Sequence, residues 1–234
     1  MKRIIKTLAE KWPEYLLEIL VLIIGIYGAF ALNNWNDELK TNKKRGIYIQ
    51  SLKKELSSDL ASFHDFSQEL TEINSSIDSV IMELKNPDLK FEDIINLVNG
   101  FRREIIVLDQ VTNSTAKTLI ASGDLDILDA SISSPLVELT ALQESSIFKD
   151  KTNKTLLAEK YIAFNKSYPF LRSSIDEHNR FYKQKVSELN FSSLFFDYLG
   201  LLTLHKLFNL RQLDLMEKLA SKSRGLLAEI DNEI

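Results

Sequence analysis

The stretch that decides the fold is Leu16–Asn36, which reads LLEILVLIIGIYGAFALNNWN. Its first part, Leu16–Leu32, is apolar or small apart from one acid, Glu18. As an α-helix this part would be roughly 25 Å long, close to the thickness of the hydrocarbon core of a bilayer. The stretch therefore predicts a transmembrane helix over residues 15–36, preceded by a basic N-terminal tail over residues 1–14.

Aromatic residues flank the predicted span. Trp12 and Tyr15 precede the apolar run, and Trp35 follows it. A helix from Trp12 to Trp35 would cover roughly 35 Å, so its two indole rings would reach opposite membrane–water interfaces. We predict that these three residues anchor the helix at the interfaces.

A cleaved signal peptide is the alternative for this segment, with Ala29-Phe30-Ala31 as the cleavage site. Two features favour an uncleaved anchor. Glu10, Glu14 and Glu18 put acids into a region that should be basic or apolar. The apolar run also continues through the supposed cleavage site without a helix breaker.

Five residues of the span recur at steps of four, three, four and three, so they share one face of a helix: Glu18, Leu22, Gly25, Ala29 and Leu32. The pair Gly25 and Ala29 allows a second helix backbone to approach closely. Glu18 has two interpretations. It either reaches the interface from its place near the start of the span, or it turns inward among packed copies, where it could line an ion pathway.

The charge distribution excludes one class of partner. Residues 1–45 carry a net charge of +3, and the remaining 189 residues carry −7. An acidic body lacks the basic stripe that nucleic-acid binding requires, so no nucleic-acid partner is expected. The chain has no cysteine, which excludes disulfides, cysteine-ligated zinc and thiol nucleophiles.

The remainder predicts an all-α fold. Residues 37–86, after the span, are predicted to form a juxtamembrane segment and a long amphipathic helix that ends at Asn86-Pro87-Asp88. Gly46 is the expected place for a bend. The apolar stripe of the long helix is coiled-coil-like and would pair either with later helices of the chain or with other copies. The stripe consists of Ile49, Leu52, Leu56, Leu60, Phe63, Leu70, Ile73, Ile77, Val80 and Leu84.

Residues 87–234 are expected to form a helical bundle that packs on the long helix. Glycines at 100 and 123 are predicted C-caps, and Tyr168-Pro169 predicts an interruption. The predicted helices cover residues 91–99, 111–122, about 129–148, 152–167, 170–190, 194–208 and 209–230.

The order of these elements resembles a bacterial family of single-span membrane proteins, the domain of unknown function 6090. In that family the span ends in a pattern like G-I-x-x-A-x-x-x-N-N-W-N, which here is Gly25–Asn36. The family's glutamate before the span corresponds to Glu18, and Thr118–Leu125 is similar to its L-I-S-S-G-x-L segment. The resemblance implies a single-pass protein of the bacterial inner membrane. The short N-terminal tail favours an N-terminus inside the cell and a body in the periplasm.

No catalytic motif stands out among the three histidines. His64 is expected to be solvated or packed, and His205 to lie in the core or at an interface. Arg172 and His178 have a spacing found in helical nucleases, which makes a membrane-tethered nuclease a third hypothesis. No phosphate-binding loop, dinucleotide fingerprint, nucleophile elbow or metal motif is present, so neither a metal nor a cofactor is predicted.

The leading hypothesis is a non-enzymatic, membrane-anchored scaffold, sensor or interaction protein. Its expected partners are the lipid bilayer, further copies of the chain, and a protein partner bound through the helical body. The second hypothesis is an oligomeric ion channel or pore subunit with Glu18 near the pore, because one span per chain cannot enclose a pore alone.

Overall fold

The computed structural model describes residues 2–101, 104–108, 111–169, 171 and 180–233; the side chains of 2–11, 13–15, 181 and 182 are not among the described parts. All regular elements of these residues are helical, which confirms the all-α prediction. The elements are α1 Lys2–Leu84, α2 Phe91–Gly100, α3 Ser114–Ser122, the 3₁₀ helix η1 Asp124–Ile127, α4 Ala130–Ser167, α5 Arg180–Ser187 and α6 Phe191–Glu233.

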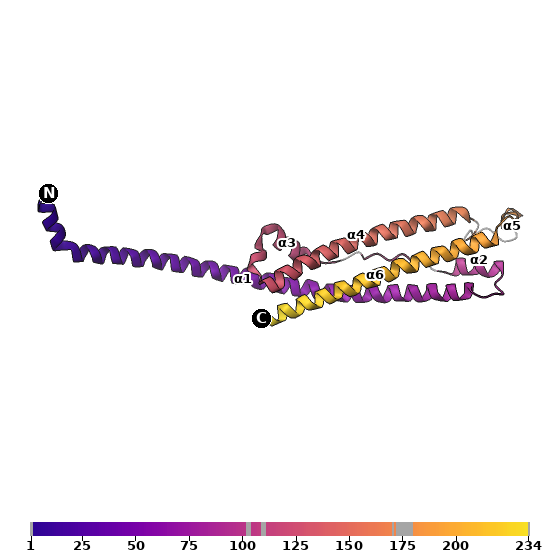
Figure 1. Cartoon of the computed structure of the whole chain (residues 1–234), viewed down its shortest axis with the longest axis horizontal. Helices are drawn as coiled ribbons and strands as arrows, with labels where there is room; N and C mark the ends of the chain where they lie inside the picture. Colours follow the sequence, from indigo (N-terminus) through magenta and orange to yellow (C-terminus); the bar gives the residue numbers. More distant parts are fainter. Residues whose placement is uncertain (1, 102–103, 109–110, 170, 172–179, 234) are drawn as a thin grey trace.

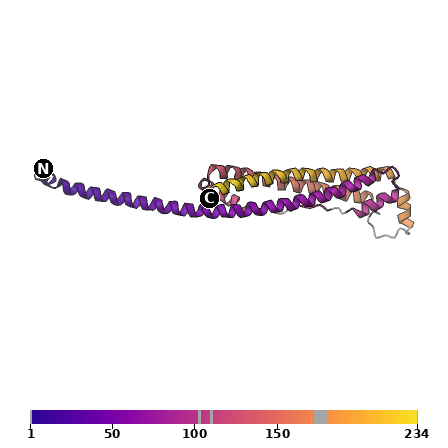
Figure 2. The ribbon, with the colours of Figure 1, turned by 90° about the horizontal axis from the view of Figure 1, so that it is seen from below.

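Three long helices, α1, α4 and α6, lie side by side as a narrow bundle (Figures 1 and 2). The chain leaves along α1, turns into α2 at the far end of the bundle, and returns through a connector without regular structure, of which residues 101, 104–108 and 111–113 are described. It then passes through α3 and η1, runs out again along α4 and comes back along α6. The end of α6 therefore lies halfway along α1, where Arg45 pairs with Glu233.

The first half of α1 projects beyond the bundle as one helix, which bends sharply close to its N-terminus (Figure 1). An 83-residue helix is about 125 Å long. The helix runs through Gly46 without interruption, so the bend expected there is absent. The apolar segment and the long amphipathic helix are therefore one continuous element.

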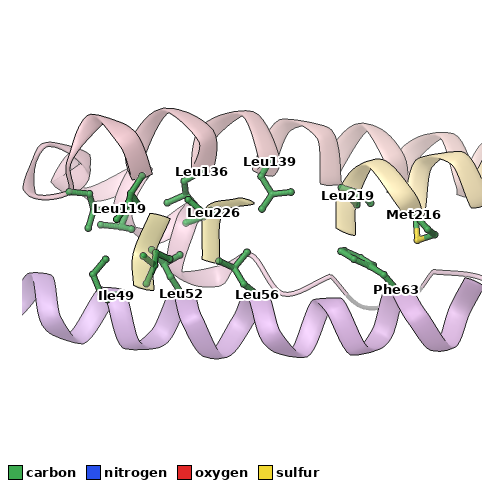
Figure 3. Close-up of a cluster of buried hydrophobic side chains, with 14 of the residues drawn as sticks. Ile49, Leu52, Leu56, Phe63, Leu119, Leu136, Leu139, Met216, Leu219 and Leu226 are labelled. Atoms are coloured by element: carbon green, nitrogen blue, oxygen red, sulfur yellow. The ribbon is translucent and has the colours of Figure 1, made fainter. Parts of the chain in front are cut away.

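The apolar stripe of α1 packs within its own chain. Near the middle of α1, its leucines face side chains of α3, α4 and α6, and Figure 3 shows Leu52 and Leu56 pointing toward Leu136 and Leu226. Each of the predicted stripe residues from 49 to 84 is buried or half-buried. The stripe therefore stabilises the bundle, and an association of copies would have to use other surfaces.

The core is divided along its length into two apolar clusters. The cluster nearer the apolar segment includes Leu52, Leu119 and Leu226, and the far cluster includes Ile77 and Tyr198. Polar side chains of α1, α4 and α6 are buried at and around the junction of the two clusters. These residues, together called the polar layer, are Asp59, Asn74, Gln143, Ser146, Asp150, His205, Asn209 and Gln212.

Two predicted helix boundaries are wrong, and the polar residues explain both. Residues 130–167 form one helix, not two that meet near Asp150, and residues 191–233 form one helix without an end near Asn209. The polar residues at these two points interrupt the apolar pattern, and such an interruption is typical of a link between two helices. Instead, they are buried inside the bundle with hydrogen-bond partners on neighbouring elements, so the helices continue through them.

The short elements agree with the sequence in part. α3 ends where predicted, because Gly123 adopts the left-handed conformation, with φ of 74°, that closes a helix. The predicted cap at Gly100 is wrong, since Gly100 is still helical and Phe101 is the cap. α4 ends at Ser167, just before Tyr168-Pro169. Of the helix predicted over 170–190, the structure describes α5 alone.

Candidate functional site

The apolar segment of α1 is fully open to its surroundings. The helix is long and apolar enough here to cross a membrane, and none of this apolar stretch is buried against the rest of the chain. Leu22 and Leu32 are exposed, as are Glu18, Gly25 and Ala29. A side chain added at Gly25 would meet nothing within 4 Å. One copy of the chain therefore leaves the predicted packing face uncovered along its whole length.

The predicted interfacial anchors lie on the same exposed rod. Trp12 and Trp35 both project from α1, at opposite ends of the apolar run. The side chain of Tyr15 lies outside the described parts. An apolar rod bounded by two exposed indoles has the surface that a lipid bilayer would cover.

The predicted nuclease pair receives no structural support, because Arg172 and His178 both lie outside the described residues. His64 is exposed on α1, as expected. In the part of the chain that the structure describes, no three histidine or acidic side chains are grouped to hold a metal ion.

The bundle contains a charged pair that the sequence analysis missed. Asp150 and Lys154, one turn apart on α4, form an ion pair with Nζ 2.9 Å from Oδ1, and their side chains are 3% and 11% exposed. The second carboxylate oxygen of Asp150 accepts the backbone N–H of Leu108 in the connector at 3.1 Å. The ammonium of Lys154 also lies 4.9 Å from the centre of the Phe66 ring. Asp150 thus links α4 to the connector and offsets a buried cation.

His205 lies beside this pair, deep in the core. Its Nδ1 is 2.8 Å from the hydroxyl of Tyr161, and its ring meets the rings of Tyr161 and Phe101 edge to face. Burial, and secondarily the charge of Lys154, lower the pKa of His205 to about 4. The imidazole is therefore neutral at pH 7, which suits a core histidine. This confirms the core role expected for His205.

A second buried carboxylate holds the other end of the connector. Asp59 of α1 accepts the backbone N–H of Thr112 at 2.8 Å and the side-chain amide of Gln143 at 3.0 Å. Burial raises the pKa of Asp59, while these hydrogen bonds oppose the rise. One turn earlier, Glu55 accepts the backbone N–H of Thr115 at 3.1 Å. Glu55 therefore caps the N-terminus of α3, whose own N-cap residue makes no side-chain cap bond.

Two members of the polar layer have a recognisable signal in the sequence. Asp59 and Asn74 fall at the spacing of the apolar stripe of α1, between Leu56 and Ile77, where a leucine or isoleucine would be expected. A polar residue on a core-facing stripe implies a buried partner. The partners themselves, such as Asn209 for Asn74 at 3.1 Å, come from a helix 135 positions away, so no sequence pattern identifies them.

These contacts position helices, and they do not form a catalytic arrangement. His205 is bonded to a tyrosine and is closed off from solvent, and the two buried carboxylates accept backbone donors. A cavity of about 810 Å³ is an open groove between α1, α2 and the connector. It is lined by glutamates such as Glu69 and Glu72, by serines and by apolar residues, without a nucleophile paired to a base.

The fold and its contacts define a class of all-α protein. One helix contains an exposed apolar segment, long enough to cross a membrane, and continues as part of a three-helix bundle. Residues 18–168 match the model of a family of unknown function, DUF6090, and the chain belongs to that family. The match begins at Glu18 and ends at Tyr168, the residue after α4, so α6 lies beyond it. No curated protein and no solved structure matches the chain.

Proposed function

We propose that the chain is a membrane-anchored helical scaffold that holds its bundle at a fixed distance from the bilayer and associates with further copies of itself. One observation carries the proposal: α1 continues unbroken from the exposed apolar segment into the core of the bundle. A joint at the membrane surface would let the bundle swing, whereas a continuous helix transmits position and rotation between the two parts. Such a rod suits a scaffold or a sensor.

The self-association rests on the face of the span that carries Gly25 and Ala29. Small residues at this spacing allow helix backbones to pack closely in a membrane, where van der Waals contact and hydrogen bonding drive association. Packing through this face also turns Glu18 toward the neighbouring copy, where its carboxyl could hydrogen-bond and escape the cost of facing lipid.

Filling the small face is expected to abolish the association through the span. In Ala29→Leu the added side chain separates the helix backbones of the spans, so the copy number per particle should fall below that of the parent. The matched control is Ala31→Leu, the same change on the opposite side of the helix, which should leave the copy number unchanged. The full chain in lipid nanodiscs, counted by single-molecule photobleaching, gives the result. A parent protein that is already monomeric would refute self-association.

We further propose that the N-terminal tail faces the cytoplasm and the bundle faces the periplasm of a bacterial inner membrane. The cysteine-free chain makes this directly measurable, because a single introduced thiol reports alone. An impermeant maleimide added to intact spheroplasts is expected to label Ser58→Cys, an exposed position on α1, and to leave Thr7→Cys unlabelled until the membrane is opened. The reverse pattern would invert the orientation.

A further inference from the structure

The outward face of α6 is apolar where a bundle helix should be polar. Buried residues such as Tyr198 and His205 mark the core side of this helix. On the opposite side, Phe196, Leu207 and Leu210 are 66%, 42% and 48% exposed. A helix that is apolar on all sides over several turns is normally covered on all sides. Within the part of the chain that the structure describes, nothing covers these three side chains on the outer face of α6.

The spacing on this face is that of a helix–helix seam. Phe196, Gly200, Thr203, Leu207 and Leu210 follow one another at steps of four, three, four and three, and all five are exposed. This 3.5-residue period keeps one line of contact facing a partner helix. Gly200 in the middle of the line allows close approach. Asp214, at the next position of the pattern, ends the apolar seam.

The membrane itself cannot cover this face. Lys206 pairs with Asp78, and Asn209 bonds Asn74, so the seam lies beside the far part of α1. About 40 residues of continuous helix separate that part of α1 from the end of the span at Asn36, which corresponds to roughly 60 Å. Even a strongly tilted span would hold the seam tens of ångströms from the bilayer that anchors it.

We infer that the seam Phe196–Leu210 is a contact surface between two copies of this chain, packed α6 against α6 in parallel. This inference rests on the proposed function, because the shared anchor sets the geometry. Copies held in one membrane by the same rod point the same way and carry their seams at the same height. A two-fold axis along the membrane normal then places each seam residue opposite the same residue of the second copy. Two apolar faces can pack in this way without complementary charges.

The area of the contact agrees with an anchored dimer. Four turns of one helix bury on the order of half of the roughly 800 Å² per partner that a stable soluble complex needs. A membrane anchor supplies the difference, because confinement to one bilayer raises the effective concentration of the second copy. A purely soluble partner would have no such assistance.

Contact at α6 is compatible with contact between the spans. In a three-helix bundle α1 lies roughly 10 Å to the side of α6. The distance along α1 from the level of the seam to Gly25 is roughly 75 Å. A tilt of under about 10° therefore brings the two spans together at the membrane, which is less than the tilt usual for transmembrane helices.

Disulfide trapping tests the seam, and the chain offers a matched pair of threonines. Thr203 on the seam and Thr71 on α1 are both exposed, and each hydroxyl donates to the carbonyl four residues earlier at 2.8 Å. In a parallel seam the two Thr203→Cys thiols face each other within disulfide reach. Membranes that contain the full-length Thr203→Cys variant are expected to give mostly disulfide-linked dimer after mild oxidation, and Thr71→Cys membranes little.

Three results would overturn the inference: equal cross-linking of both variants, cross-linking of neither, or a Thr203→Cys adduct with a different protein. A second variant, Leu207→Glu in the Thr203→Cys background, should reduce the dimer at least tenfold, because it puts like charges on the seam. Its α-helical circular dichroism should match the parent, since residue 207 faces outward. Absence of the Thr203→Cys cross-link in membranes where the photobleaching copy number is above one would reject the seam and leave association through the span intact.

Discussion

Replacing Asp150 by alanine is expected to lower the free energy of unfolding of the bundle by about 3–5 kcal/mol, the range found when one partner of a buried ion pair is removed. The carboxylate offsets the ammonium of Lys154 and accepts the N–H of Leu108, and the Asp150 side chain is 3% exposed. Without it, a nearly buried cation loses this counter-charge, and Leu108 of the connector loses its bond to a buried carboxylate.

Chemical denaturation of the full chain in mild detergent, followed by circular dichroism at 222 nm, measures this effect. Tryptophan fluorescence is unsuitable, since Trp12 and Trp35 both lie on α1 before the bundle begins. The control is Glu144→Ala, which breaks an exposed pair with Lys117 and should cost no more than about 0.5 kcal/mol.

A second variant separates charge from packing. Asp150→Ala combined with Lys154→Met removes both charges and is expected to recover a large part of the loss, because the cost of the single change comes from the remaining cation. If the double variant is less stable than Asp150→Ala, the ion pair does not carry the effect.

The contribution of His205 to the free energy of unfolding is expected to fall by about 3 kcal/mol as the pH drops from 6.5 toward 4. The folded-state pKa of His205 is lowered from 6.5 to about 4. Between these two pH values His205 is protonated in the unfolded chain and neutral in the folded chain, so a fall in pH favours unfolding. The contribution of the neutral ring is complete above pH 6.5 and is lost as the pH falls through this window.

The cause lies in the surroundings of the ring. Tyr161 bonds its Nδ1, Phe101 covers it edge to face, and the positive charge of Lys154 faces it from α4. Asp59 acts in the opposite sense: its raised pKa makes the folded chain take up a proton first, so acid stabilises that site. The total pH dependence therefore mixes opposing contributions, and a variant is needed to isolate that of His205.

His205→Gln provides that variant, because glutamine keeps a polar partner for Tyr161 and does not titrate. The expected result is a shallower fall in the free energy of unfolding between pH 6.5 and 4 than in the parent protein, measured by the same denaturation at several pH values. His64→Gln is the matched control, since His64 is exposed, and its curve should parallel that of the parent. Identical slopes in all three proteins would contradict a buried, neutral His205.

The polar layer has a structural consequence beyond its energy. Three long helices with apolar stripes can slide past one another in steps of one turn, because leucine is equivalent to leucine. A pairing such as Asn74 with Asn209, or Asp59 with Gln143 and Thr112, is satisfied in one register only. We therefore expect these contacts to fix the alignment of α1, α4 and α6, and with it the height of the α6 seam above the membrane.

The sequence by itself determined the local features of this protein. The apolar run after Leu16, the stripe from Ile49 to Leu84, and the helix end at Gly123 each follow from short-range patterns, since hydropathy, helical periodicity and glycine conformation act within a few residues. The family resemblance likewise rested on contiguous motifs around Glu18 and Thr118, and the match over residues 18–168 confirms it.

Only the tertiary structure decided which polar residues are inside. Asp150 and Asn209 looked like helix boundaries in the sequence, yet each lies in the middle of a helix, because a donor or acceptor from a distant element satisfies it. The converse applies to Phe196 and Leu207, which are apolar and nevertheless lie on the outside of the bundle. Burial depends on what packs opposite a side chain, and that is fixed by contacts between helices far apart in the chain.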